Sequence, residues 1–361
     1  MILVDNKLLF YLLVSFLSTY MIIKFLIKYS KPLNLIDQPN YRKFHNDDTP
    51  LVGGLGIIIS FFLIFFLSWL FSWHLIYLPL NEIILILIGS LIIILTGLID
   101  DLKGLIPRDK FLFQLIAALI LVVGIPKFQS IQWPLYDVFN YNIYISSFIT
   151  IFYIIGILNA INLIDGLDGL AGGVSIIITI TFIGLSLLSG LQLKEMYPLI
   201  ILIGSLLGFI MHNRPPANTF LGDTGSLFLG WFFAVFSLIY AQKTTFSLSI
   251  LIPIMILGLP AFDVIFVMLK RFNDRHDYKI KNRLKSIFKA DNNHLHHIIV
   301  LSGISKGKAL IILYFLNVLI SIIALFSYFK RDNIDLIYSV IFILVIIFTI
   351  RFLFSLRMKN E

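Results

Sequence analysis

Long apolar stretches alternate with short polar segments along almost the whole chain, and this pattern predicts membrane-spanning helices. A helix that crosses the hydrocarbon core of a bilayer needs about 20 apolar residues. About eleven stretches approach that length, over residues 8–27, 54–73, 83–99, 111–125, 148–163, 174–188, 196–211, 225–240, 246–269, 309–329 and 336–350. The expected fold class is all-α, a polytopic integral membrane protein with one transmembrane domain over residues 1–361.

Composition supports this fold class, because the chain lacks the polar residues that a water-exposed surface requires. Hydrophobic residues make up 59% of the 361 positions, and charged residues only 13%. The mean hydropathy is +0.95. Such a chain needs lipid to cover its surface. The first apolar stretch lacks a basic start and a small-residue cleavage site, so we expect an uncleaved helix.

The Lys and Arg residues indicate how the helices are oriented. If the connections alternate between the two sides, 21 Lys and Arg lie on one side, 6 on the other, and Lys24 lies inside a span. The richer side is expected to be cytoplasmic. The N-terminus is then outside and the C-terminus inside. The loops expected at the cytoplasmic face are about 28–53, 100–110, 164–173, 212–225 and 270–308. The absence of Cys excludes disulfides and thiolate metal sites.

Three clusters of carboxylate and amide side chains lie at the cytoplasmic ends of separate apolar stretches. They are Asp100-Asp101, the segment 159–169 with its two Asp-Gly pairs, and the segment 220–225. Each has an ordinary structural interpretation, because Asp-Gly marks turns and an acidic pair often ends a helix. Ionisable groups in membrane proteins are nevertheless usually functional. Together the clusters predict one polar site with oxygen ligands for a hard divalent cation, suited to phosphate chemistry.

The segment 270–308 holds ten Lys and Arg and also three His residues within four positions. The basic charge alone is typical of cytoplasmic loops that attract anionic headgroups. His294, His296 and His297 are more specific, because imidazoles donate to phosphate oxygens and transfer protons near neutral pH. Metal binding is the rival interpretation, but their spacing differs from the i, i+4 pair of helical zinc sites. Phosphate contact is the favoured hypothesis.

The order of the polar motifs resembles a known family. The chain has Asp-x-Pro-Asn-x-Arg-Lys-x-His over 37–45, then Pro-Leu-Val-Gly-Gly over 50–54. The Asp pair, Asn-x-x-Asn-x-x-Asp-Gly-x-Asp-Gly, Phe-x-Gly-Asp-x-Gly and His-x-His-His follow. From about Asp37 to Ala309 this order resembles the polyprenyl-phosphate N-acetylhexosamine-1-phosphate transferases.

The resemblance implies a reaction and its partners. A polyprenyl phosphate oxygen would attack the β-phosphate of a UDP-N-acetylhexosamine, which gives a lipid pyrophosphoryl sugar and UMP. We expect undecaprenyl phosphate as acceptor, Mg²⁺ as cofactor with Mn²⁺ as the alternative, contact with membrane lipid and no nucleic acid. A homodimer is left open. The expected location is the bacterial cytoplasmic membrane, with the active site on its cytoplasmic face.

The resemblance also implies roles for single residues. Asp223 would hold the metal, and Asp100 and Asp101 would serve the lipid phosphate and a general-base step. His294, His296 and His297 complete the expected catalytic group. The expected substrate-binding residues are Lys43, His45, Asn162, Asp165, Asp168, Asn213, Phe220 and Asp263.

Small differences between motifs favour one branch of the family. Relatives that resemble the UDP-MurNAc-pentapeptide translocase carry Pro-Thr-Met-Gly-Gly and His-His-His, whereas this chain has Pro-Leu-Val-Gly-Gly and His-Leu-His-His. Its segment 260–263 also resembles the Pro-x-x-Asp of the UDP-GlcNAc branch. The segment 284–288 departs from that branch, which usually shows Arg-Gly-x-Ser-Pro-Phe. GlcNAc-1-phosphate transfer is the main prediction, as the first membrane step of a cell-surface polysaccharide.

Three alternatives remain beside this prediction. Phospho-MurNAc-pentapeptide transfer is the alternative within the family. A membrane transporter would need broken helices around a midplane site, and the middle of these stretches is nearly free of polar groups. An intramembrane aspartyl protease would need two Asp inside the bilayer, whereas here the clusters lie at its edge. Metal-dependent release of UMP on addition of lipid phosphate would separate these classes.

Overall fold

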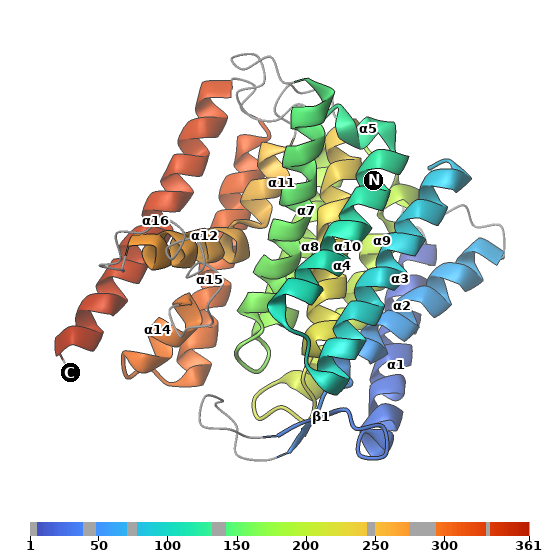
Figure 1. Cartoon of the computed structure of the whole chain (residues 1–361), viewed down its shortest axis with the longest axis horizontal. Helices are drawn as coiled ribbons and strands as arrows, with labels where there is room; N and C mark the ends of the chain where they lie inside the picture. The colour runs from blue at the N-terminus through green and yellow to red at the C-terminus, as the bar shows by residue number, and fades with distance from the viewer. Residues whose placement is uncertain are drawn as a thin grey trace.

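The computed structural model describes residues 6–38, 48–70, 78–131, 142–243, 250–273, 294–329 and 333–360, which form a bundle of helices (Figure 1). The first half contains α1 (Asn6–Tyr29), β1 (Ile36–Asp37), β2 (Thr49–Pro50), α2 (Gly53–Leu70), α3 (Leu80–Lys103), α4 (Pro107–Gly124), α5 (Pro126–Gln129) and α7 (Ile143–Ile164). The second half contains α8 (Leu170–Leu188), the 3-10 helix η1 (Leu193–Met196), α9 (Tyr197–Asn213), α10 (Gly222–Lys243), α11 (Leu251–Ile256), α12 (Gly258–Asn273), α14 (Leu295–Leu301), α15 (Lys306–Ser327) and α16 (Asn333–Asn360).

Within these described ranges, seven helices are long and apolar enough to cross a membrane. They are α1, α2, α3, α7, α8, α10 and α15, and shorter apolar helices occur within α9, α12 and α16. Many large apolar side chains on the outside of the bundle are exposed, as expected of a surface that lipid covers. The chain is therefore an all-α, multi-pass membrane protein, while the number of eleven spans stays a prediction.

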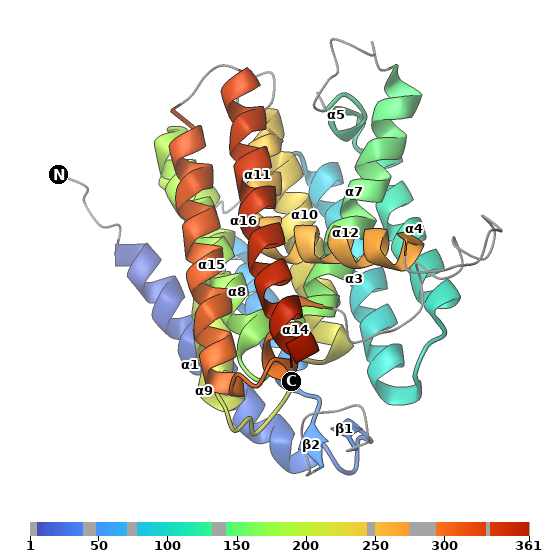
Figure 2. The same ribbon diagram turned by 90° about the vertical axis from the view of Figure 1, so that its left-hand side faces the viewer.

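One expected span is wrong in detail. The stretch 246–269 was expected to form one helix, but its described part is broken at Leu257 into α11 and α12. Its two prolines, Pro253 and Pro260, lie in the first turns of these helices, where a missing N–H is tolerated. In a continuous helix Pro260 could not donate to the carbonyl of Ile256. As a result α12 lies across the other helices instead of along them (Figures 1 and 2).

The central helix α10 is the most completely buried of the seven candidate spans. It packs against α3, α7 and α2. Glycines bring these backbones close together at the end that carries the acidic clusters. A Cβ built on Gly97 of α3 would lie 2.5 Å from Thr224 Cα, and one built on Gly54 of α2 would lie 2.4 Å from Gly225 Cα. This close approach places the first turn of α10 beside the end of α3.

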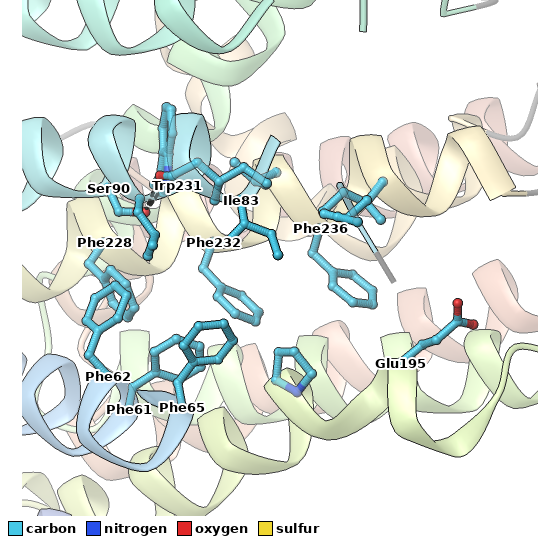
Figure 3. Close-up of a pocket in the computed structure, with 16 residues that line it drawn as sticks. Phe61, Phe62, Phe65, Ile83, Ser90, Glu195, Phe228, Trp231, Phe232 and Phe236 are labelled. Atoms are coloured by element: carbon cyan, nitrogen blue, oxygen red, sulfur yellow. Dashed lines mark hydrogen bonds between the residues drawn. The ribbon is translucent and has the colours of Figure 1, made fainter. Parts of the chain in front are cut away.

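Further along the same helices, α2, α3 and α10 enclose an aromatic cleft with a cavity volume of about 110 Å³ (Figure 3). Phe228, Phe232 and Phe236 line it from one face of α10. The indole Nε1 of Trp231 donates to Ser90 Oγ at 2.9 Å, which satisfies both groups. Because the lining is almost entirely apolar, the cleft offers no place for phosphate chemistry.

The described part of the first polar loop forms a small antiparallel ribbon, which was not expected from the sequence. Strands β1 and β2 pair antiparallel, with Ile36 opposite Pro50. The Phe220 N–H donates to the Pro50 carbonyl at 2.9 Å, and the Gly53 N–H donates to the Phe220 carbonyl at 3.0 Å. These bonds fasten the ribbon to the connection between α9 and α10. Lys43 and His45, expected to bind substrate, lie outside the described residues.

Candidate functional site

The three acidic clusters meet around one cavity of about 500 Å³ at one end of the bundle. Nine of the residues singled out from the sequence line it: Asp100, Asp101, Asn162, Asp165, Asp168, Asn213, Phe220, Asp223 and His297. They come from the end of α3, the last turn of α7 and the turn after it, the end of α9 and the connection after it, the start of α10, and α14. Among the described residues, Asp37 and Lys306 also line the cavity and were not predicted.

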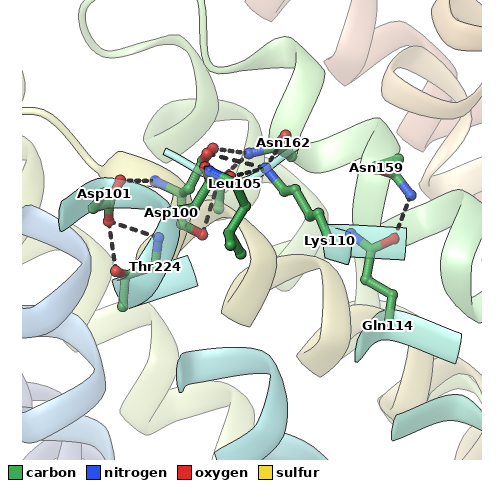
Figure 4. A network of polar contacts seen from close by, with 10 residues as sticks. Asp100, Asp101, Leu105, Lys110, Gln114, Asn159, Asn162 and Thr224 are labelled. Carbon is green, nitrogen blue, oxygen red and sulfur yellow. Dashed lines mark hydrogen bonds and ion pairs between the residues drawn. The ribbon is translucent and has the colours of Figure 1, made fainter. Parts of the chain in front are cut away.

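A lysine that sequence reasoning missed lies at the centre of the acidic groups (Figure 4). The Lys110 Nζ lies 2.9 Å from Asp100 Oδ2 and 3.0 Å from Asp223 Oδ2. It also donates to Asn162 Oδ1 at 3.3 Å. Lys110 was expected to lie in a loop before the fourth span, but it belongs to the first turn of α4. The site therefore contains a cation held by three oxygens from three different helices.

Asp101 holds the start of α10. One of its oxygens, Oδ1, accepts the Asp223 N–H at 2.7 Å, and Oδ2 accepts the Thr224 N–H at 2.9 Å and the Thr224 hydroxyl at 2.5 Å (Figure 4). The first N–H groups of a helix lack partners within it and favour negative charge. Asp101 thus caps α10 from another helix. Gly222, with φ of 72°, makes the turn that leads into α10.

Asn162 links Asp223 to α7. Its Nδ2 donates to Asp223 Oδ1 and, at 2.8 Å, to Ser226 Oγ. One turn earlier, Asn159 Nδ2 donates to Gln114 Oε1 of α4 at 2.9 Å. Both Asn residues of the Asn-x-x-Asn motif therefore fix the helices around the acidic groups, and Asn162 orients the Asp223 carboxylate directly.

The turn between α7 and α8 is held by Asn213. Its Oδ1 accepts the Gly169 N–H at 2.8 Å, and its Nδ2 donates to the Thr219 carbonyl at 2.8 Å. Gly169 has φ of 81°, which favours glycine. Asp168 Oδ2 accepts the Ala217 N–H at 3.2 Å. Asn213 and Asp168 thus join this turn to the connection before α10 and define one side of the cavity.

Asp165 is the C-cap residue of α7 and lies among other negative charges. Burial raises the pKa of its carboxyl to about 8, and the charges of Asp223, Asp101 and Asp168 add to the shift. A group in this state would lose its proton more easily if a cation were placed nearby. The cavity therefore has an electrostatic preference for added positive charge.

The three His residues of the His-x-His-His motif differ in how they lie relative to the cavity. Only His297 is among the cavity-lining residues of the described chain, whereas the His294 Nδ1 lies 2.9 Å from Asp263 Oδ2. The His296 ring packs against Gly166, where a built Cβ would lie 2.1 Å from Nε2. Burial lowers the pKa of His296 to about 3, with a further contribution from His297. Burial therefore favours the neutral form of the His296 ring in this conformation.

The donor set suits Mg²⁺ bound together with phosphate. Among the described residues, no three His, Cys, Asp or Glu side chains are grouped so that they could hold a metal ion by themselves. Mg²⁺ is usually bound by one or two carboxylates, with substrate phosphates and water as the other ligands. Asp223, Asp100 and Asn162 offer such hard oxygens around a single point, now taken by the Lys110 ammonium. The residues present fit this mode of binding.

Comparison with known proteins decides the family. Residues 83–241, which include all three acidic clusters, match glycosyl transferase family 4. The chain is 33% identical over 335 residues to a probable undecaprenyl-phosphate N-acetylglucosaminyl 1-phosphate transferase of Bacillus subtilis (strain 168). The aligned region covers 92% of this chain and 88% of the relative. The chain belongs to glycosyl transferase family 4.

Relatives of this chain include both kinds of transferase that were weighed from the motifs. A phospho-N-acetylmuramoyl-pentapeptide-transferase of Staphylococcus epidermidis is 31% identical over 333 residues, with 87% of this chain and 97% of the relative covered. An undecaprenyl-phosphate alpha-N-acetylglucosaminyl 1-phosphate transferase of Haemophilus influenzae is 26% identical over 313 residues, with 84% and 82% covered. This multi-pass membrane protein thus has bacterial relatives, as expected from the motifs.

Proposed function

We propose that the chain transfers GlcNAc-1-phosphate from UDP-GlcNAc to undecaprenyl phosphate and releases UMP, as the first membrane step of a cell-surface polysaccharide. The observation that carries this proposal is the single cavity in which Asp100, Asp165 and Asp223 meet around Lys110 at the ends of membrane helices. A lipid phosphate at the membrane surface can reach such a cavity. The similarity to the Bacillus subtilis relative over most of both chains supports the same donor and acceptor.

The reaction forms a bond between an oxygen of the lipid phosphate and the β-phosphorus of the donor. The bond from that phosphorus to the oxygen bridging the α- and β-phosphates breaks, and UMP leaves with the electron pair. Both reactants are anionic, so positioning and charge neutralisation contribute most of the catalysis. Asp223, with the oxygens of Asn162 and Asp100, would hold Mg²⁺, which would supply positive charge to the pyrophosphate.

Lys110 is the protein's own cation at the reacting phosphates. Its side chain is 14% exposed, and Asp100 and Asp223 hold the ammonium in place. A fixed cation in a partly buried site stabilises negative charge that develops in the transition state. We assign Lys110 to the oxygens of the transferred phosphate, which the ammonium contacts while Asp100 keeps it in place.

The contacts of the acidic pair favour positioning roles over proton abstraction. A phosphate monoester has a second pKa of about 6, so the attacking phosphate is already deprotonated at neutral pH. Asp101 is occupied by the N–H groups that begin α10, and Asp100 accepts the Leu105 N–H at 2.6 Å beside its Lys110 pair. We therefore propose that Asp101 positions Asp223, and that Asp100 positions Lys110, with no general base required.

Other residues of the cavity suit the nucleotide. Asp165, Asp168 and Phe220 line the cavity, and Asn213 fixes the two turns that carry them. Carboxylates accept hydrogen bonds from ribose hydroxyls or from a base N–H, and an aromatic ring offers a stacking surface. His297, the cavity-lining member of the His motif, is proposed to donate to a phosphate oxygen.

Assays with several donors test the proposed substrate. We expect UDP-GlcNAc to be turned over, because the Pro-Leu-Val-Gly-Gly and His-Leu-His-His motifs favour a simple N-acetylhexosamine, and we expect no turnover of UDP-MurNAc-pentapeptide. The measurement is kcat/KM for UDP-GlcNAc, UDP-GalNAc, a 6-deoxy analogue and UDP-MurNAc-pentapeptide. The Staphylococcus epidermidis relative makes the pentapeptide donor the main competitor. A preference for that donor would contradict the proposed substrate and leave the type of reaction intact.

The orientation of the protein can be tested with single cysteines, because the native chain has none. We propose that the cavity faces the cytoplasm. Arg108, whose side chain is 84% exposed, lies near the cavity end, and Tyr144, 81% exposed, lies in the first turn of α7 at the other end. In intact cells a membrane-impermeant maleimide should label Tyr144→Cys, and should label Arg108→Cys only after permeabilisation. The reverse pattern would show that the cavity faces outward.

A further inference from the structure

Asp263 forms a buried junction between three segments. It lies on α12 and is 4% exposed. Its Oδ2 lies 2.9 Å from the His294 Nδ1, and its Oδ1 accepts the Leu295 N–H at 2.9 Å. The Arg351 Nη1 of α16 donates to the same Oδ1 at 2.8 Å. Both carboxylate oxygens are therefore engaged, and two of the three contacts reach the start of α14.

Arg351 is an unusual residue for its place in the chain. It is 8% exposed and lies within the apolar part of the last long helix, 88 positions from Asp263. A guanidinium keeps its charge under all physiological conditions, and arginines in apolar spans are rare and tend to be functional. Helix α16 also packs against α12 and α14, and α14 lies at its lower end in Figure 2.

The start of α14 leads directly to the cavity. His294 precedes the helix, His296 packs on Gly166 of the turn after α7, and His297 lines the cavity. The ring centroids of His294 and His296 are 6.0 Å apart, and those of His296 and His297 are 4.2 Å apart. Because the three rings pack in succession, a shift of His294 would move the two rings nearest the substrate.

We propose that Arg351 is a positioning residue of the transfer reaction: through Asp263 it fixes His294 and the first turn of α14, and so aims His297 at the substrate phosphates. This inference rests on the proposed function. The charge of Arg351 balances the buried carboxylate of Asp263. Without that cation Asp263 would be an uncompensated buried charge, and it would regain balance by taking up a proton or by moving. Either change weakens its contacts with His294 and the Leu295 N–H.

The central variant is Arg351→Gln, assayed as the purified full-length protein with UDP-GlcNAc and undecaprenyl phosphate. We expect kcat to fall by about 10- to 100-fold, as when reacting groups are displaced by about 1 Å. The KM for undecaprenyl phosphate should stay near the parental value, because neither Arg351 nor Asp263 is among the residues that line the cavity. Arg351→Lys keeps a cation within reach of Asp263 and should recover most of kcat.

Val345→Gln is the matched control. Val345 lies on the same helix and is 53% exposed on the surface of the bundle, so the variant adds the same amide to α16 without changing the Asp263 junction. It should keep the parental kcat. Melting temperatures of all variants show whether a loss of rate reflects unfolding.

The variant Asp263→Asn/Arg351→Gln separates positioning from general stability, because it removes both charges together and leaves no unpaired ion. If Arg351 acts through Asp263, this double variant should be no slower than Asp263→Asn alone. The role of Arg351 would be contradicted if the losses in kcat of the two single variants multiplied in the double variant. It would also be contradicted if Arg351→Gln were no slower than Val345→Gln. Absence of parental turnover would instead contradict the function on which this role rests.

Discussion

Asp223→Asn should reduce turnover by at least about 1,000-fold, equivalent to about 4 kcal/mol of transition-state stabilisation, while the protein stays folded. The substitution removes a negative charge that a hard cation needs as a ligand. The fold should tolerate it because Asp101 binds the backbone N–H of residue 223, which the substitution retains. The measurement is UMP release over a series of Mg²⁺ concentrations, together with the melting temperature.

Asp109→Asn is the control for this prediction. Asp109 is in the first turn of α4, and its side chain is 39% exposed and paired with Arg108. The variant therefore makes the same chemical change near the same end of the bundle, outside the cavity lining. It should keep the parental rate. Mg²⁺-dependent turnover near the parental rate in Asp223→Asn would show that Asp223 is not the metal ligand.

Lys110→Gln should lower kcat by about 100- to 1,000-fold, the range seen when one preorganised donor to a transition-state oxyanion is removed. The Gln amide can still hydrogen-bond to Asp100 or Asp223, but it has no positive charge to neutralise that of the phosphates. The loss should appear in kcat more than in KM, because the negative charge that Lys110 stabilises grows in the transition state. Steady-state kinetics with both substrates varied provide the measurement.

Lys103→Gln is the matched control for Lys110→Gln. Lys103 is exposed in the last turn of α3, near the same end of the bundle. If the effect of Lys110 came from the general positive charge of this surface, both variants would slow the reaction alike. Equal losses in the two variants would rule out a specific role for Lys110 at the transferred phosphate.

The convergence of the acidic clusters could be anticipated because each is a local feature at the end of an apolar stretch. Asp100, Asp165 and Asp223 lie where helices begin or end, and the alternation of spans puts these ends on one side. That they line one cavity follows from the fold. Their chemical roles stay predictions.

The contacts that organise the cavity could not be anticipated in the same way. Lys110 is a single basic residue beside a helix start, and no local pattern distinguishes it from Arg108, two positions earlier. Its partner Asp223 is 113 positions away in the sequence. Asp101, expected to act on substrate, also caps α10 across 122 positions, and no local pattern indicated that contact. Such pairings depend on how whole helices pack.

The stretch 246–269, which is broken into α11 and α12, shows a limit of prediction from hydropathy. Apolar residues indicate that a segment avoids water, but they do not indicate its direction within the bundle. The prolines at 253 and 260 were the available signal for the break. The break matters for the site, because α12 carries Asp263 across the bundle to meet His294 and Arg351.

The fate of the β-phosphate tests the central claim most directly. Purified protein is incubated with undecaprenyl phosphate, Mg²⁺ and UDP-GlcNAc carrying a radioactive β-phosphate, and the lipid and nucleotide products are then separated. Transfer of GlcNAc-1-phosphate predicts that the label enters the lipid fraction and that unlabelled UMP appears in equal amount, only when lipid phosphate is present. Release of the label as UDP would mean that the sugar alone is transferred, and would contradict the proposed reaction.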